Sequence, residues 1–242
     1  MPPVSAVIIA RDEEARIGAA VASVSPWVDE VLVLDGGSSD ATAAVAAHAG
    51  ARVISHPFDG FVAQKQRATD AARHDLVFSL DADERVDPEL GRALRGVTDG
   101  RARAVRRLNY LDGRVLRASG WGRDRPVRFF DRRVVRWGGT DPHDHLVVTG
   151  RPPVLPGALH HDPDRTTAAY VRGTVAHARR ASIGLADRRP GALAPAAHAT
   201  GHFVRKMILG AAFVDGRRGL TVAWVGARGV ARKYRLARSL TR

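Results

Sequence analysis

The regular alternation of short apolar runs with longer mixed segments over the first eighty residues constrains the fold of this chain most. Four runs rich in apolar and β-branched residues cover residues 4–10, 30–35, 51–55 and 76–80. Such runs are typical of strands buried on both faces. Between the first two, Ile17, Val21 and Val24 recur at helical spacing. Strands that alternate with helices indicate parallel βαβ units, so we expect an α/β domain with a mostly parallel, Rossmann-like sheet flanked by helices.

Polar residues follow three of these predicted strands. Arg11 follows the first, Asp35 closes the second, and Asp81 and Asp83 follow the fourth. In open sheets of this kind, ligands bind beyond the carboxyl ends of the strands. Side chains at i and i+2 of an extended segment point the same way, so the two aspartates can face one hard cation, which takes oxygen ligands. Two solvated aspartates in a loop are the alternative interpretation of this pair taken alone.

The length and composition limit the possible classes. A chain of 242 residues suits one α/β domain, with or without an appendage. It has no cysteine, which excludes a disulfide framework and thiolate chemistry. The first residues lack the basic segment of a signal peptide, and no stretch approaches the roughly 20 apolar residues of a membrane span. We therefore expect a cytoplasmic protein. The formal net charge of +13 favours polyanions such as nucleic acid, anionic lipid or phosphorylated substrates.

The pattern changes after residue 100. Residues 104–110 and 127–137 have the composition of strands, and residues 138–165 are expected to be loops because they are rich in Gly, Pro, His and Asp. From residue 166 onward the pattern becomes helical and basic. The predicted parts are a catalytic domain at 1–165, with a nucleotide-binding half at about 1–100 and an acceptor half at about 101–165, and a helical extension at 166–242.

Seven segments in order along the chain resemble family 2 glycosyltransferases of the GT-A fold, and most of all the subgroup of lipopolysaccharide core β-glucosyltransferases. The segments are VIIARDEE (7–14), WVDEV (27–31), DGGSSDAT (35–42), GFVAQKQR (60–67), LDADE (80–84), GWGRD (120–124) and PHDHL (142–146). The resemblance covers residue 4 to roughly residue 235. Any one segment is a common pattern, but the ordered set is specific.

The resemblance implies an inverting, metal-dependent transfer of a sugar from a nucleoside-diphosphate sugar, expected to be UDP-linked, to a lipid-linked or cell-envelope polysaccharide acceptor. It also implies a divalent cation, Mg²⁺ or Mn²⁺, which take oxygen ligands. The implied nucleotide-sugar residues are Ala10, Arg11, Glu13, Asp35, Lys65 and Asp81, and the implied metal ligands are Asp83, Asp81 and a later histidine, His161. A solvated or capping role is the alternative for that histidine.

Three positions depart from the family pattern, which usually has Asn at Asp12 and Arg67 and Glu at Asp144. Asp144 is our first candidate for the base that takes the proton of the acceptor hydroxyl, and Asp124 is the second. The alternatives are a turn residue for Asp144 and an arginine-paired residue for Asp124. Trp121, with Trp137, is expected either to line the acceptor side or to lie in the core.

The basic C-terminal part favours an anionic membrane surface. Residues 203–214 read as an apolar helix with two cations, and residues 220–240 interleave apolar residues with Arg and Lys, with Arg242 just beyond. We therefore expect a peripheral protein on the inner face of the plasma membrane. The alternative is that these helices pack on the catalytic domain and expose a solvated basic face.

Three other functions are weighed against this interpretation. A sugar-1-phosphate nucleotidyltransferase needs a Gly-rich loop after the first strand, and residues 10–14 contain no glycine. A nucleic-acid-binding protein would account for the charge, but we recognise no binding module and the strand-end carboxylates would repel phosphate. A metallohydrolase would use His160 and His161 together with His143, Asp144 and His145, but their spacing matches no zinc pattern.

Overall fold

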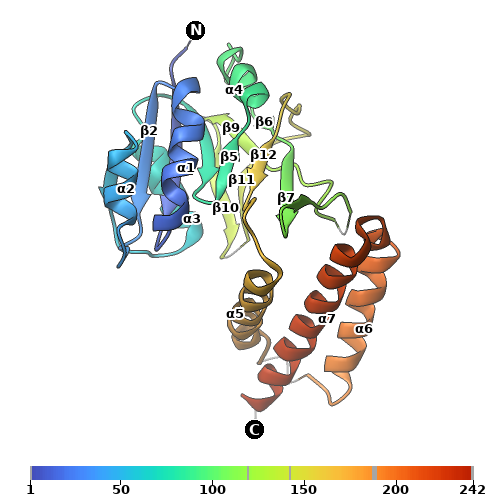
Figure 1. Ribbon diagram of the computed structural model, residues 1–242. Helices are drawn as coiled ribbons and strands as arrows, with labels where there is room; N and C mark the ends of the chain where they lie inside the picture. The colour runs from blue at the N-terminus through green and yellow to red at the C-terminus, as the bar shows by residue number, and fades with distance from the viewer. Residues whose placement is uncertain (1, 119, 142, 187–189, 241–242) are drawn as a thin grey trace. The chain divides into compact units, whose positions relative to one another are not determined.

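The computed structural model describes residues 2–118, 120–141, 143–186 and 190–240 (Figure 1). Pro142 of the PHDHL segment and Arg242 lie outside the described residues. The chain forms two compact units. The first comprises Met1–Arg107 and Arg125–His161, and the second comprises Leu108–Asp124 and Asp162–Arg242. Residues 108–124 of the expected acceptor half thus cluster with the C-terminal helices. The boundary at residue 165 between the catalytic domain and the helical extension stays a prediction.

A six-stranded sheet forms the centre of the first unit, in the order β3-β2-β1-β4-β9-β6. The strands are β1 (Val4–Ala10), β2 (Glu30–Asp35), β3 (Arg52–Ser55), β4 (Leu76–Asp81), β6 (Arg103–Ala104) and β9 (Val127–Asp131). The first four run parallel, whereas β9 is antiparallel to β4 and β6 is antiparallel to β9. The four predicted parallel strands are therefore confirmed, and a mostly parallel sheet results.

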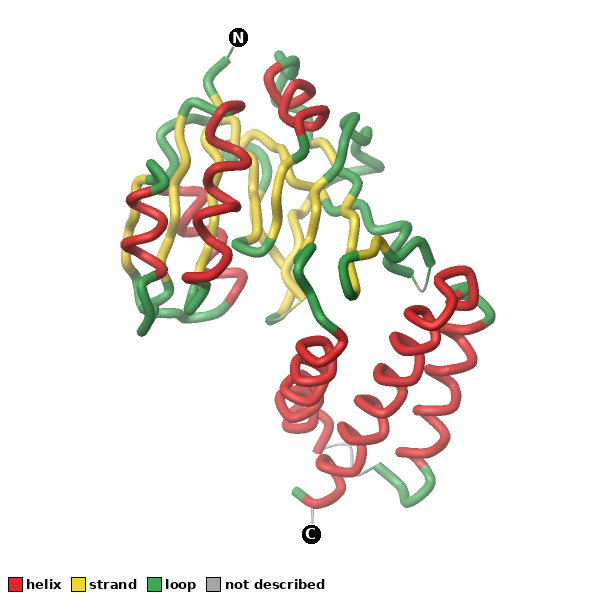
Figure 2. Tube along the Cα trace, in the orientation of Figure 1, coloured by secondary structure: helices red, strands yellow, loops and turns green. Residues whose placement is uncertain are grey.

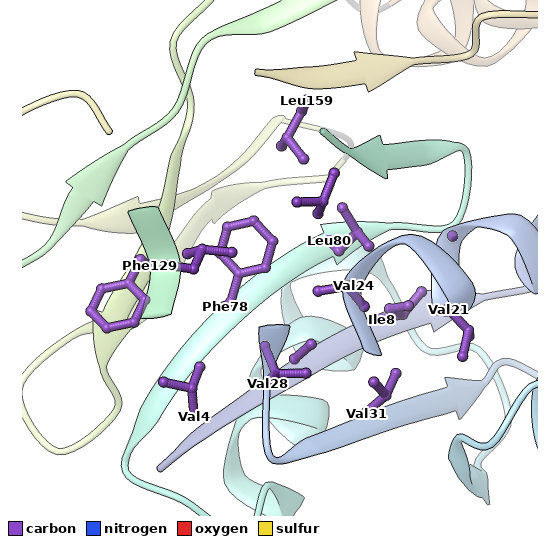
Figure 3. Packing of buried hydrophobic residues seen from close by; sticks show 14 of the residues in the cluster. Val4, Ile8, Val21, Val24, Val28, Val31, Phe78, Leu80, Phe129 and Leu159 are labelled. Atoms are coloured by element: carbon purple, nitrogen blue, oxygen red, sulfur yellow. The ribbon is translucent and has the colours of Figure 1, made fainter. Parts of the chain in front are cut away.

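Helices cover both faces of this sheet (Figures 1 and 2). They are α1 (Glu14–Val24), η1 (Ser25–Trp27), α2 (Thr42–His48), α3 (Phe61–Ala71) and α4 (Pro88–Arg95). Apolar residues of α1, α2 and α4 join the core on one face together with Ile8, Phe78 and Leu80 (Figure 3). Residues of α3 join the core on the other face with Leu32 and Leu34. Because β1, β2 and β4 are covered on both faces, their side chains are mostly apolar in both directions.

Two antiparallel pairs complete the first unit. β10 (Arg136–Thr140) pairs with β11 (His143–Val147), and β5 (Glu84–Val86) pairs with β12 (Leu159–His161). The expectation of loops over residues 138–165 is therefore wrong in part. Gly, His and Asp supply little apolar alternation, but here Trp137 and Leu146 anchor the β10–β11 pair in the core beside α3. The pairing thus depends on a tertiary contact that local composition does not reveal.

The second unit is mainly helical. It contains β7 (Arg107–Leu111, of which residue 107 is in the first unit), β8 (Arg114–Val115), α5 (Thr167–Ala186), α6 (Ala194–Met207), η2 (Ala212–Asp215) and α7 (Gly216–Ser239). α7 packs against both α5 and α6, with His198 stacked on Tyr234 at 4.2 Å between ring centroids. The predicted fold class, an α/β sheet domain with a basic helical C-terminal part, is confirmed. Within the described part of the chain, none of the helices is both long and apolar enough to cross a membrane.

Candidate active site

A cavity of about 480 Å³ lies beyond the carboxyl ends of β1, β2 and β4, where the parallel strands predict a ligand site. Most of the predicted donor-site residues line it. Its walls are Ile9, Ala10, Arg11, Glu13, Leu34, Gly36, Phe58, Phe61, Gln64, Lys65, Asp81, Ala82, Asp83, Asp144 and His161. The structure therefore brings together residues that are up to 152 positions apart in the chain, all from the first unit.

The loops after β1 and β2 are tied together by a carboxylate that departs from the family pattern. Asp12 lies at φ 55°, a left-handed conformation that Asp and Asn tolerate. Its Oδ1 accepts hydrogen bonds from the backbone N–H and the hydroxyl of Ser39, at 2.8 and 3.0 Å. These bonds lower the pKa of the exposed Asp12 carboxyl, the backbone bond most of all. Asp12 therefore shapes the rim of the cavity as an Asn amide oxygen would.

Asp35, predicted as a nucleotide-sugar residue, turns toward its own loop. The side chain is buried, and Oδ2 accepts the N–H groups of Gly37 and Ser38, both at 3.2 Å. The Ser38 hydroxyl also donates to Oδ1. These bonds fix the turn after β2, where Gly37 takes φ 79°. In this arrangement Asp35 shapes the loop, and its contact with the nucleotide sugar stays a prediction.

Asp81, at the end of β4, is surrounded by cations. Its Oδ1 lies 3.1 Å from Lys65 Nζ, and its Oδ2 lies 2.5 Å from Arg128 Nη2 and 3.8 Å from Arg107 Nη1. Burial by itself would raise the pKa of Asp81, but the charges of Arg128 and then Lys65 outweigh it and hold that pKa well below its usual range. Asp81 is therefore a carboxylate at neutral pH.

Behind Asp81 lies a buried ion pair that the sequence analysis missed. Arg128 of β9 and Glu84 of β5 are both buried, and Arg128 Nη2 lies 2.6 Å from Glu84 Oε1. Glu84 Oε2 also accepts the backbone N–H of Asp81 at 3.0 Å. The two carboxylates raise the pKa of Arg128 although burial opposes this. The available signal was Arg128 within the apolar run of residues 127–130, because a charge on a buried strand needs a partner.

Lys65 of α3 links Asp81 to the candidate base. Its Nζ lies 2.8 Å from Asp144 Oδ2 on β11, and 4.8 Å from the ring centroid of Trp137. Trp137 is buried, and its Nε1–H donates to Thr69 at 3.0 Å. This favours the core interpretation of Trp137. The contacts between α3 and the β10–β11 pair thus place Asp144 at the cavity, beside the cation that Asp81 also holds.

Asp83 and His161 face each other at another part of the cavity. Asp83 Oδ2 lies 3.3 Å from His161 Nε2, which β12 brings beside β5. Burial raises the pKa of Asp83, but the His161 hydrogen bond and charge outweigh it and lower that pKa. A carboxylate and an imidazole in contact suit a cation such as Mn²⁺ or Mg²⁺ whose other ligands are phosphate oxygens or water. Within the described residues no group of three or more His, Cys, Asp or Glu side chains gathers for a metal.

An aromatic pair also lines the cavity and was not predicted as part of the site. Phe58 and Phe61 pack edge to face at 5.1 Å between centroids, and both are about a third exposed. The Arg11 guanidinium lies 5.9 Å from the Phe58 centroid. Arg67, the second of the three departures from the family pattern, pairs with Asp59, at 3.1 and 2.9 Å. The aromatic signal was present in the sequence as a Phe on each side of Asp59-Gly60.

The two remaining predicted residues lie in the second unit. Asp124 accepts a hydrogen bond from Asn109 at 3.4 Å. The Trp121 ring packs edge to face on Tyr170 at 5.5 Å, and the Arg165 guanidinium lies 5.7 Å from its centroid. These contacts place both residues within the packing of the second unit. Their roles as second base and acceptor residue stay predictions.

The fold and this site define an α/β protein with a charged cavity at the carboxyl edge of its parallel strands. Residues 5–152 match the sequence profile of Glycosyl transferase family 2. This chain belongs to that family, and the predicted family and the glycosyltransferase class are confirmed.

Individual relatives are similar over part of their length. An uncharacterized glycosyltransferase of Rickettsia felis is 44% identical over 90 residues, which are 37% of this chain and 32% of the relative. The lipopolysaccharide core biosynthesis glycosyltransferase LpsC of Rhizobium meliloti is 38% identical over 93 residues, or 36% of this chain and 34% of LpsC. The match thus spans about a third of the length of these curated relatives.

Among solved structures, glucosyl-3-phosphoglycerate synthase from Mycobacterium tuberculosis in complex with Mn²⁺, uridine diphosphate and glucosyl-3-phosphoglycerate is 28% identical, with a TM-score of 0.43. The match covers 55% of this chain and 57% of the synthase.

Proposed function

We propose that this chain transfers a sugar from a nucleoside-diphosphate donor, a UDP-sugar by the sequence resemblance, to an acceptor hydroxyl with inversion at the anomeric carbon. The observation that carries the proposal is the linked set Asp144–Lys65–Asp81 beside Asp83 and His161, at the carboxyl edge of the sheet in a family 2 chain.

Donor binding follows from the charges and rings around the cavity. The diphosphate is anionic, so it is attracted to Lys65, whose Nζ faces the cavity between two carboxylates. The rings of Phe58 and Phe61, each about a third exposed, offer an apolar surface to the base, and Arg11 lies beside Phe58. Asp81 is held ionised by Arg128, so it orients Lys65 rather than taking up a proton.

Asp83 and His161 would hold a divalent cation, and we propose Mg²⁺ or Mn²⁺ because carboxylate, imidazole and phosphate ligands suit both. When bound, such a cation supplies Lewis-acid stabilisation of the charge on the leaving diphosphate. The ionised Asp83 matters before that, because a carboxylate with a lowered pKa is ready to bind a cation at neutral pH.

Asp144 would accept the proton of the acceptor hydroxyl. The acceptor oxygen bonds to the anomeric carbon as the bond from that carbon to the phosphate oxygen breaks, and the proton moves to Asp144. Oδ2 of Asp144 lies 2.8 Å from Lys65 Nζ. Donor diphosphate competes for the same ammonium, which releases Asp144 for the acceptor. Asp124 remains the second candidate for this role.

For the acceptor we propose a lipid-linked or cell-envelope polysaccharide, reached by a peripheral protein on the inner face of the plasma membrane, with Trp121 on the acceptor side. The support is the similarity to LpsC, whose name places it in lipopolysaccharide core biosynthesis. The lipopolysaccharide core β-glucosyltransferase subgroup belongs to the same proposal. The basic C-terminal helices suit an anionic surface.

Thermal unfolding of the purified protein with UDP-, GDP-, ADP- and dTDP-sugars, each with and without Mn²⁺, tests the donor site. A bound ligand raises Tm by mass action. We expect one nucleotide class to stabilise the wild type when metal is present. The effect should vanish in Asp83→Asn and persist in Asp75→Asn, a control at the opposite end of β4, where Asp75 pairs with Arg132.

Asp144→Asn separates binding from chemistry. We expect it to keep the donor-dependent rise in Tm and to lose transfer by about 10²-fold or more, the usual contribution of a general base. Near-normal turnover would remove Asp144 from the role. No response of the wild type to any donor would contradict the proposed donor site.

A further inference from the structure

The turn that joins α6 to α7 exposes a group of large apolar side chains. Ile208 is 67% exposed, Leu209 81%, Phe213 65% and Val214 60%. These four residues, which we call the apolar tip, lie within seven positions at one end of the α6–α7 pair (Figures 1 and 2). Adjacent exposed side chains of this size are unusual on a solvated surface and mark an interaction site.

The apolar tip belongs to a turn that packing and hydrogen bonds hold in place. Ala212, between the exposed residues, is fully buried. Gly219 of α7 passes so close that a Cβ there would lie 1.8 Å from the Ala212 carbonyl oxygen. The Asp215 carboxylate accepts the backbone N–H groups of Arg117 and Ala118 at 2.8 and 2.9 Å. The turn therefore presents its apolar side chains from a fixed backbone.

Cations flank the apolar tip along the chain, where acidic residues are rare. Residues 191–242 contain ten Lys or Arg and a single acidic residue, Asp215, whose carboxylate is engaged as just described. Arg205 lies in the last turn of α6, Arg217 lies at the start of α7, and both are exposed. On α7, Leu220 and Trp224 continue the exposed apolar surface at 48% and 56%. Trp favours the membrane–water interface.

We infer that the apolar tip inserts into the headgroup region of an anionic lipid bilayer, with Arg205 and Arg217 beside the lipid phosphates. An exposed apolar group with a cation on each side of it in the chain is complementary to such a surface, which offers hydrocarbon below a layer of negative charge. The inference rests on the proposed function in one respect: membrane binding serves the enzyme if its acceptor is lipid-linked and lies at this surface. The physical binding does not depend on catalysis.

Flotation with lipid vesicles tests the inference. The probes are vesicles of phosphatidylcholine alone and of an equal mixture with phosphatidylglycerol, at low and high salt. We expect binding to the anionic vesicles that weakens with salt. The variant Leu209→Asn/Phe213→Asn should bind at least tenfold more weakly, because two apolar side chains no longer leave water. Leu193→Asn is the control, because Leu193 is also 81% exposed but precedes α6.

Equal binding of the tip variant and the Leu193→Asn control, or no binding of the wild type to anionic vesicles at low salt, would overturn the inference. So would a wild-type dimer without lipid that becomes a monomer in the tip variant, because a second copy would then cover the tip. Donor-dependent stabilisation is measured on the same samples. If it is absent while vesicle binding behaves as expected, only the proposed enzymatic function fails.

Discussion

Removal of the Arg128 guanidinium is the perturbation whose cost the structure defines most directly. Arg128 is 4% exposed, and its Nη2 lies 2.5 Å from Asp81 and 2.6 Å from Glu84, which is fully buried. Arg128→Met keeps much of the side-chain volume but removes a positive charge that both carboxylates contact. Breaking a buried ion pair costs roughly 3–5 kcal/mol. Because Lys65 and Arg107 still contact Asp81 at 3.1 and 3.8 Å, we expect about 3 kcal/mol.

Chemical denaturation followed by circular dichroism measures this loss. The control is Arg133→Met, because Arg133 is 66% exposed and pairs with Asp131 at 2.6 Å, and exposed pairs contribute about 0–1 kcal/mol. Adding Glu84→Gln to Arg128→Met should restore part of the loss, since a neutral amide replaces the stranded charge. Equal losses in Arg128→Met and Arg133→Met would refute the reasoning, because Arg128 would then not be a buried partner.

Two further predictions concern pH and backbone geometry. The folded pKa of Asp81 is depressed, so its contribution to stability is present above its unfolded pKa of about 3.9 and is lost as the pH falls through the folded value. The difference in unfolding free energy between wild type and Arg128→Met should therefore shrink below about pH 4, and an unchanged difference at pH 3 would contradict this. Gly157→Ala should destabilise by more than about 2 kcal/mol, because Gly157 has φ 81° and a Cβ would lie 2.1 Å from the Leu90 nitrogen at the start of α4. Gly150→Ala, at φ 74° with nothing within 4 Å of the added Cβ, isolates the conformational cost of about 1–2 kcal/mol, and equal melting temperatures for the two variants would count against the clash.

Much of the first unit could be predicted because its signals are local. β1, β2 and β4 are covered on both faces, so each reads as a mostly apolar run with a polar residue at or just after its end. The positions of Arg11, Asp81 and Asp83 at the cavity follow from that rule and from the parallel order of the strands. The β10–β11 pair escaped prediction because its register is fixed by packing of Trp137 and Leu146 beside α3.

The sequence by itself determined the alternation of strands and helices in the first unit, the family, and the basic character of the C-terminal helices. Periodicity, motif order and charge can all be read along the chain. Only the tertiary structure decided the partners of each charge. Asp81 is held by Arg128 and Lys65, and Lys65 by Asp144, from strands and a helix far apart in the chain. Ion pairing depends on distance and burial in space, and a linear pattern carries neither.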